Sequence, residues 1–214
     1  MPKFYVVISK TTTNIGRCIR VVSSCTYNHS AISFDKDLTK LYAFARRQRN
    51  SCMTAGLVHE STARYMERKG AEVPIKVFEF DVTEEQVEEI RDIVKVMLNN
   101  PEYMYNAPSL VSYPIIKGVR TYKAYTCSEF VATVLNKLGI ISGKEPCKYS
   151  PEDLIDELSG YEIFSGDMQD FVTTITHDEG YYASYSIHTF KQSFLTIVTL
   201  VKRTILRRRY SDAA

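Results

Sequence analysis

The stretch "YTCSEFVATVLNKLG", residues 125–139, predicts one helix with a cysteine in its first turn. Thr126 and Glu129 form the T-x-x-E pattern of a capping box directly before an apolar run, and Gly139 is placed to end the helix. Cys127 is then the first helical residue. There the unpaired N–H groups and the positive end of the helix dipole lower the pKa of a thiol and can also hold an oxyanion.

A cysteine at a helix start is by itself weak support for catalysis, because free cysteines are among the most buried residue types. A thiol nucleophile also needs an adjacent base. The stretch "YNHSAISFD", residues 27–35, offers one at the start of a predicted strand, where His29 shares a face with Ala31 and Ser33. These small neighbours leave room beside the imidazole. The alternative is a hydrogen-bonded histidine at a strand end.

The composition limits the function classes. The chain has 214 residues, and its net charge of +2 is too small to argue for a nucleic-acid partner. It has five cysteines and no CxxC pair, so we expect free thiols, no metal and no cofactor. The apolar run near the N-terminus is short for a signal peptide, which predicts a cytoplasmic protein.

Helix and strand signals alternate along the chain, and neighbouring strands are joined as hairpins, which predicts an α+β fold with an antiparallel sheet packed against helices. The capping box of Thr83 and Gln86 begins a second helix, and Ser150 with Pro151 begins a third. The expected strands are 4–9, 29–34, 41–47, 75–82 and 161–166, with a short helix at 13–24.

The tail differs from the rest. We expect a domain over residues 1–170 and an extension over 171–214 that carries a basic amphipathic helix. Within 187–209 an apolar stripe is accompanied by six basic residues. This pattern fits a helix lying on an anionic membrane, and it fits slightly better a helix docked on the domain with its arginines in solvent. The stripe comprises Ile187, Phe190, Phe194, Val198, Val201 and Ile205.

Several segments together resemble the circularly permuted papain-like proteins. These are the permuted NlpC-type thiol hydrolases, which include the YiiX-like proteins and, more distantly, the lecithin retinol acyltransferase group. The resemblance covers roughly residues 3 to 168, and in that family the histidine strand precedes the cysteine helix, as it does here. The segments are "YNHSAISFDKDLTKLYAFARR", "GLVHES", "IKVFEFDVTEEQVEEIRDIV", "AYTCSEFVATVLNKLGI" and "YSPEDL".

The resemblance implies a cysteine hydrolase in which Cys127 is the nucleophile and His29 the general base, acting on an amide, ester or thioester. The family often has a third polar residue about one strand after the histidine. That position falls near Ala43, which is no carboxylate. Either a dyad suffices, or His59 or Glu60 of "GLVHES" orients the ring, and of these a carboxylate is the better acceptor.

The substrate is open between a small molecule, a peptide and a lipid. Tyr27 and Tyr125 each precede a proposed catalytic residue by two positions, and either line the cleft or pack. Together with Ser128 they are the candidate substrate-binding residues. The alternatives to a hydrolase are a lipid acyltransferase and a catalytically silent protein that keeps the fold for binding or for membrane contact.

Overall fold

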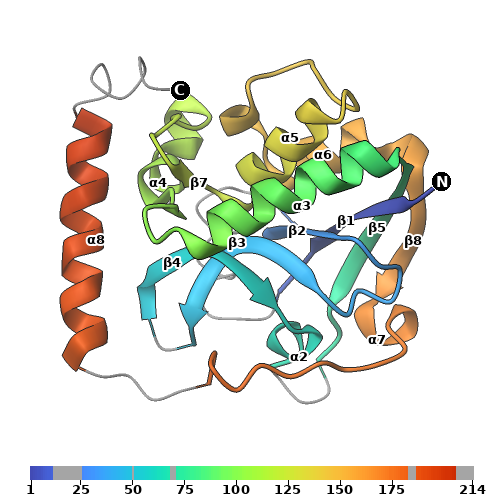
Figure 1. Cartoon of the computed structure of the whole chain (residues 1–214), viewed down its shortest axis with the longest axis horizontal. Helices are drawn as coiled ribbons and strands as arrows, with labels where there is room; N and C mark the ends of the chain where they lie inside the picture. Colours follow the sequence, from blue (N-terminus) through green and yellow to red (C-terminus); the bar gives the residue numbers. More distant parts are fainter. Residues whose placement is uncertain (12–25, 50, 68–70, 183–186, 206–214) are drawn as a thin grey trace.

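The computed structural model describes residues 1–11, 26–49, 51–67, 71–182 and 187–205. At its centre lies a six-stranded antiparallel sheet with the strand order β4-β3-β2-β1-β5-β8 (Figure 1). A separate two-stranded parallel ribbon pairs β6 with β7. The strands are β1 (Lys3–Ser9), β2 (His29–Ser33), β3 (Leu41–Gln48), β4 (Ser51–Glu60), β5 (Pro74–Asp81), β6 (Met104–Tyr105), β7 (Ala124–Tyr125) and β8 (Glu162–Asp167).

Helices lie on both faces of the sheet. Three of them, α3, α5 and α6, start at the predicted caps, where Thr83, Thr126 and Ser150 each complete a capping box. The α-helices are α2 (Thr62–Tyr65), α3 (Glu84–Asn99), α4 (Ala107–Ile116), α5 (Cys127–Lys137), α6 (Pro151–Glu157), α7 (Met168–Phe171) and α8 (Ile187–Ile205). Two short 3₁₀ turns span Pro146–Lys148 and Ser159–Tyr161.

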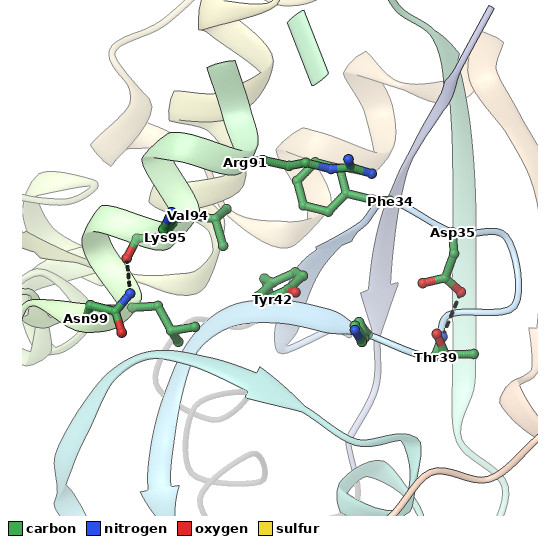
Figure 2. Close-up of a pocket in the computed structure, with 10 residues that line it drawn as sticks. Phe34, Asp35, Thr39, Tyr42, Arg91, Val94, Lys95 and Asn99 are labelled. Carbon is green, nitrogen blue, oxygen red and sulfur yellow. Dashed lines mark hydrogen bonds between the residues drawn. The ribbon is translucent and has the colours of Figure 1, made fainter. Parts of the chain in front are cut away.

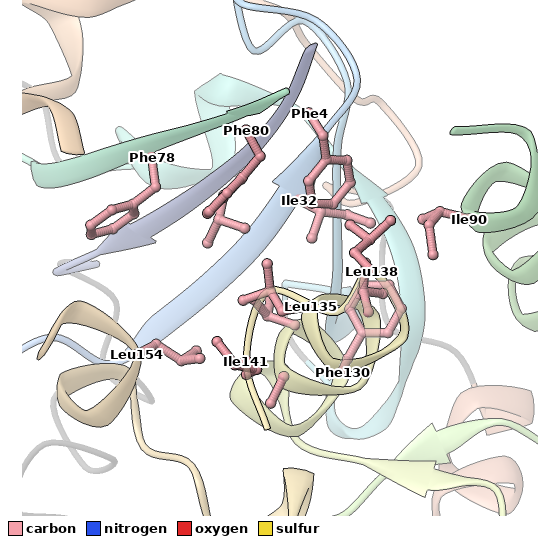
Figure 3. Packing of buried hydrophobic residues seen from close by; sticks show 14 of the residues in the cluster. Phe4, Ile32, Phe78, Phe80, Ile90, Phe130, Leu135, Leu138, Ile141 and Leu154 are labelled. Carbon is pink, nitrogen blue, oxygen red and sulfur yellow. The ribbon is translucent and has the colours of Figure 1, made fainter. Parts of the chain in front are cut away.

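Alternation along the strands divides the core into two layers. On β1, Phe4, Val6 and Ile8 face a larger cluster that α3, α5 and α6 complete (Figure 3). Tyr5 and Val7 face a smaller cluster that includes side chains of α2 and α7. The mixed α+β class and the helix-covered antiparallel sheet are therefore as predicted from the sequence.

The β2–β3 hairpin is as predicted, and its register pairs Ile32 with Tyr42 and Ser33 with Leu41. On the other side, β2 pairs with β1, so that His29 lies opposite Ser9 at one end of the sheet. Helix α3 begins at its predicted capping box and buries one stripe, which consists of Val87, Ile90, Val94 and Met97.

The sequence analysis did not predict strands β4 and β6 or helices α2, α4 and α7. The first five residues of "GLVHES" end strand β4. The expected helix at 13–24 lies outside the described residues.

The tail packs on the domain. The residues before the gap at 183–186 run along α2, where Thr176 and Thr62 exchange hydrogen bonds through their N–H and hydroxyl groups. Helix α8 packs against β4 and α4 (Figure 1). None of the described helices has both the length and the apolar character needed to cross a bilayer.

Candidate active site

Cys127 begins helix α5 as predicted. The Thr126 side chain accepts from the Glu129 N–H and the Glu129 side chain accepts from the Thr126 N–H, which closes the capping box. These bonds leave the N–H groups of Cys127 and Ser128 at the open end of the helix. Cys127 is only 5% exposed. Its thiol therefore lies at the positive end of the helix dipole in a nearly closed site.

His29, the first residue of β2, lies between two partners. Its Nε2 lies 2.7 Å from Oε2 of Glu60, and both side chains are largely buried. The ring also hydrogen-bonds with the Cys127 thiol. Since Glu60 occupies Nε2, Nδ1 is the nitrogen left for the sulfur. The structure thus brings Cys127, His29 and Glu60 together in one row, from three elements far apart in the sequence.

Glu60 is held in place from a second side. The hydroxyl of Tyr65 donates to the same Oε2 atom at a distance of 2.7 Å. Burial alone would raise the pKa of Glu60, but the His29 charge and hydrogen bond, helped by nearby Arg64, lower it to about 2. The carboxylate therefore stays ionised across the physiological range and can stabilise an imidazolium.

The charges of the three groups support one another. Burial opposes a charged imidazole, yet the Glu60 carboxylate and the Cys127 sulfur outweigh it and raise the pKa of His29 to about 10. For Cys127, burial raises the pKa of the thiol, and its interactions with His29 and Ser30 outweigh that effect and lower it. The preferred state near neutral pH is therefore a thiolate next to an imidazolium.

Of the two residues of "GLVHES" that the sequence analysis considered, only Glu60 reaches the ring. Successive side chains of β4 point to opposite faces of the sheet, so His59 turns away from His29. His59 packs instead against Tyr42, with 5.7 Å between ring centroids. The position near Ala43 is buried in the core and carries no polar group.

Tyr105 is a site residue that the sequence analysis missed. Its hydroxyl hydrogen-bonds with the Cys127 sulfur, and burial together with the charge of that sulfur raises the pKa of the phenol. The β6–β7 ribbon causes this placement, because Tyr105 pairs with Tyr125, two residues before the nucleophile. No local pattern in "YMYNAPS" signals such a partner.

Ser30 also adjoins the thiol. Its backbone N–H donates to the Cys127 sulfur, and its buried hydroxyl has no oxygen or nitrogen partner among the described residues. It directly follows His29 in β2. The strand thus supplies two successive groups to the sulfur.

The predicted substrate-binding residues have structural contacts. Ser128 is buried and donates its hydroxyl to the Tyr149 carbonyl at 2.7 Å, so that hydroxyl is engaged. Tyr125 packs against Phe44, with 5.2 Å between centroids. Tyr27 is half-buried against the same core cluster. Packing thus accounts for all three without a substrate.

Cys147, the other cysteine whose side chain the structure describes, differs from Cys127. Burial raises the pKa of the Cys147 thiol, which makes it a poor nucleophile. Within the described ranges, no three His, Cys, Asp or Glu side chains gather as a metal site would require.

An open groove of about 510 Å³ lies between the β2–β3 hairpin and α3, at the opposite end of β2 from His29 (Figure 2). Phe34 and Tyr42 line it on the sheet side, and Arg91 and Lys95 line it from α3. Neither Cys127 nor His29 contributes to its lining, so it is separate from the candidate active site.

Comparisons of the chain with family models, with curated proteins and with solved structures found no match. The functional interpretation therefore depends on the residues of the site and their geometry.

Proposed function

We propose that the protein is a cysteine-dependent hydrolase of permuted papain-like fold, acting on an amide or ester bond. The observation that carries the proposal is the His29 ring, which contacts the Cys127 thiol through one nitrogen and the Glu60 carboxylate through the other. A nucleophile, a base and a group that orients the base are the three parts that covalent acyl transfer needs. The order of the histidine strand and the cysteine helix is also that of the permuted family.

In this mechanism the Cys127 thiolate attacks the substrate carbonyl. The oxyanion that forms accepts hydrogen bonds from the N–H groups at the start of α5, and the Tyr105 hydroxyl lies within reach of the same centre. When the carbon–nitrogen or carbon–oxygen bond breaks, the His29 imidazolium gives its proton to the leaving group. A thioester with Cys127 remains.

Water then attacks the thioester while His29 takes up one of its protons. The carbon–sulfur bond breaks, the carboxylic acid leaves, and the thiolate and imidazolium are restored. Throughout the cycle, Glu60 keeps the ring oriented and stabilises its charge, and Tyr65 holds Glu60. An alcohol or amine in place of water would make the same site an acyltransferase.

Alkylation by iodoacetamide tests the activated pair. We expect Cys127 to react at pH 7 at least about tenfold faster than Cys147, since each unit of pKa between two thiols changes the thiolate fraction tenfold. His29→Ala should remove this advantage, and mass spectrometry of the modified peptides measures both rates. Equal rates for the two thiols in the native protein would contradict the proposal.

Activity is tested with libraries of amides and esters, comparing the native chain with Cys127→Ala. Hydrolysis that the variant lacks supports the proposal, and transfer to an added alcohol or amine identifies an acyltransferase. A rapidly alkylated Cys127 without any turnover would instead favour the catalytically silent alternative.

A further inference from the structure

The C-terminal part of helix α8 docks through Leu200 and Arg203. Leu200 is buried with Met104 and Ala124 in a small apolar cluster. Arg203 is also buried, and its Nη1 donates to the carbonyls of Glu102 and Tyr122 at 2.8 and 3.2 Å. The sequence analysis placed the arginines of this helix in solvent, and for Arg203 that expectation is wrong. Among the described side chains of α8, Leu200 and Arg203 fix the C-terminal part of the helix to the domain.

The C-terminal end of the apolar stripe of α8, whose side chains the structure describes, points outward. At 100° per residue, the stripe positions Val201 and Ile205 lie on the side of the helix away from Leu200 and Arg203. Their exposure agrees, because Ile205 is 74% exposed and Val201 about half exposed. Leu195 lies on the outer side too and is 63% exposed. A helix that docks by one face and leaves an apolar face in water is unusual for a stable soluble domain.

Helix α4, which packs beside α8, exposes apolar side chains as well (Figure 1). Ile115 is 85% exposed, and Val111, one turn earlier on the same face, is also exposed. Ile116 is about half exposed, and Lys117 directly follows the helix. We call the outer face of α8 and these residues of α4 the α4–α8 surface.

The charge next to this surface is mainly positive. Residues 103–128 contain no Asp or Glu, and neither do residues 180–211. Glu102, which lies beside Arg203, is already paired with Lys123. Lys117 and Lys202 are exposed and have no ion-pair partner among the described residues. Exposed aliphatic side chains among unopposed cations match the interface of an anionic bilayer, which takes up both.

We propose that the α4–α8 surface binds peripherally to anionic phospholipid membranes. Ile115 and Ile205 enter the headgroup region, while Lys117 and Lys202 pair with lipid phosphates. A second copy of the chain is a poorer partner, because pairing this surface with itself would bring basic segments together. The proposal does not depend on the hydrolase activity.

Co-sedimentation of the full chain with vesicles tests the proposal. We expect binding to vesicles that contain phosphatidylglycerol, weaker binding to phosphatidylcholine alone, and loss of binding at high salt. The double variant Ile115→Ser with Ile205→Ser should bind at least about tenfold more weakly, because it removes the apolar insertion. The double variant Lys117→Glu with Lys202→Glu should weaken binding at least about a hundredfold, because it reverses two charges.

Val96→Ser is the matched control. Val96 is also an exposed aliphatic residue, at 57%, but it lies on α3, which has more acidic than basic residues, so this variant should bind like the native chain. Cys127→Ala should also bind normally, which separates this proposal from the proposed catalysis. Equal binding of the native chain and both double variants would overturn the proposal. A concentration-dependent dimer in sedimentation equilibrium that Ile205→Ser disrupts, without vesicle binding, would overturn it in favour of self-association.

Discussion

Helices α3 and α5 begin in the same way and differ in everything that follows. Each starts after a threonine whose side chain completes a capping box, with Gln86 as the third helical residue in α3 and Glu129 in α5. Helix α3 then buries a single stripe, while α5 buries eight residues, including almost all of its first two turns. The capping box therefore sets where a helix starts, and the packing around that start decides whether it can carry chemistry.

The largest difference between the two helices should appear in stability. Phe130→Ala in α5 removes a fully buried ring from the main core cluster and should lower the free energy of unfolding by about 3–5 kcal/mol. Val96→Ala on the exposed side of α3 should change it by less than about 0.5 kcal/mol. Urea unfolding followed by circular dichroism measures both. A loss below about 1 kcal/mol for Phe130→Ala would mean that α5 is not central to the core.

The second prediction concerns the Glu60 carboxylate at the end of β4, whose charge acts through His29 on the thiol at the start of α5. Glu60→Gln keeps the shape of the side chain but removes the charge that raises the pKa of His29, so the imidazolium and the thiolate next to it become less favourable. The pKa of the Cys127 thiol then rises, the thiolate fraction at pH 6 falls by up to tenfold for each unit of that rise, and alkylation slows accordingly. Rates are measured with iodoacetamide.

Glu89→Gln on the exposed face of α3 is the control for that experiment, since Glu89 pairs only with Lys137 at the surface. It should leave the alkylation rate of Cys127 unchanged. An unchanged rate in Glu60→Gln as well would show that the dyad alone activates the thiol.

The sequence predicted those parts of the site that depend on neighbouring residues. The Thr126 and Glu129 pattern predicted the position of Cys127 at a helix start, and alternation in "HSAISF" predicted the open side of His29. It chose Glu60 over His59 only because a carboxylate is the better acceptor, since "GLVHES" was not recognised as the end of a strand. Once β4 is known, alternation alone places the two residues on opposite faces.

The contact of Tyr105 with Cys127 could not be predicted from the sequence, for a different reason. It meets Cys127 through the pairing of β6 with β7, two strands of two residues each that no periodicity can indicate. The tail shows a third kind of limit. It was predicted to be helical and is helical over Ile187–Ile205, but periodicity does not tell which face meets the domain. In the part whose side chains are described, Leu200 and Arg203 dock while the stripe residues Val201 and Ile205 are exposed.

The third prediction concerns Glu129, the third helical residue of α5, which corresponds to Gln86 in α3. Burial raises the pKa of Glu129 to about 7, outweighing the hydrogen bonds from Thr126 and Asn106. Between the unfolded value near 4.5 and this folded value, the folded state binds more protons, so stability falls as the pH rises. Between pH 5 and pH 7 the loss should be about 2 kcal/mol.

Glu129→Gln should remove that slope, because the amide oxygen can accept the same two hydrogen bonds without titrating. The measurement is the difference between the stability curves of the native chain and the variant, which cancels the contribution of His29. Parallel curves over this range would show that the Glu129 carboxyl titrates normally.

The smallest effect is expected at the caps themselves. Thr83→Ala removes one hydrogen bond at an exposed helix start, where water can replace it, and should cost about 0.5–1 kcal/mol. Thr126→Ala removes the acceptor of the buried Glu129 N–H, which water reaches poorly, so it should cost about 1–2 kcal/mol. Chemical denaturation of both variants measures the two losses. Because Cys127 follows this cap directly, Thr126→Ala should also slow the alkylation of Cys127 through a loosened helix start, whereas Thr83→Ala should not. If the two variants lose the same stability and the alkylation rate of Cys127 does not change, then burial of the α5 start does not make its cap more important than the exposed cap of α3.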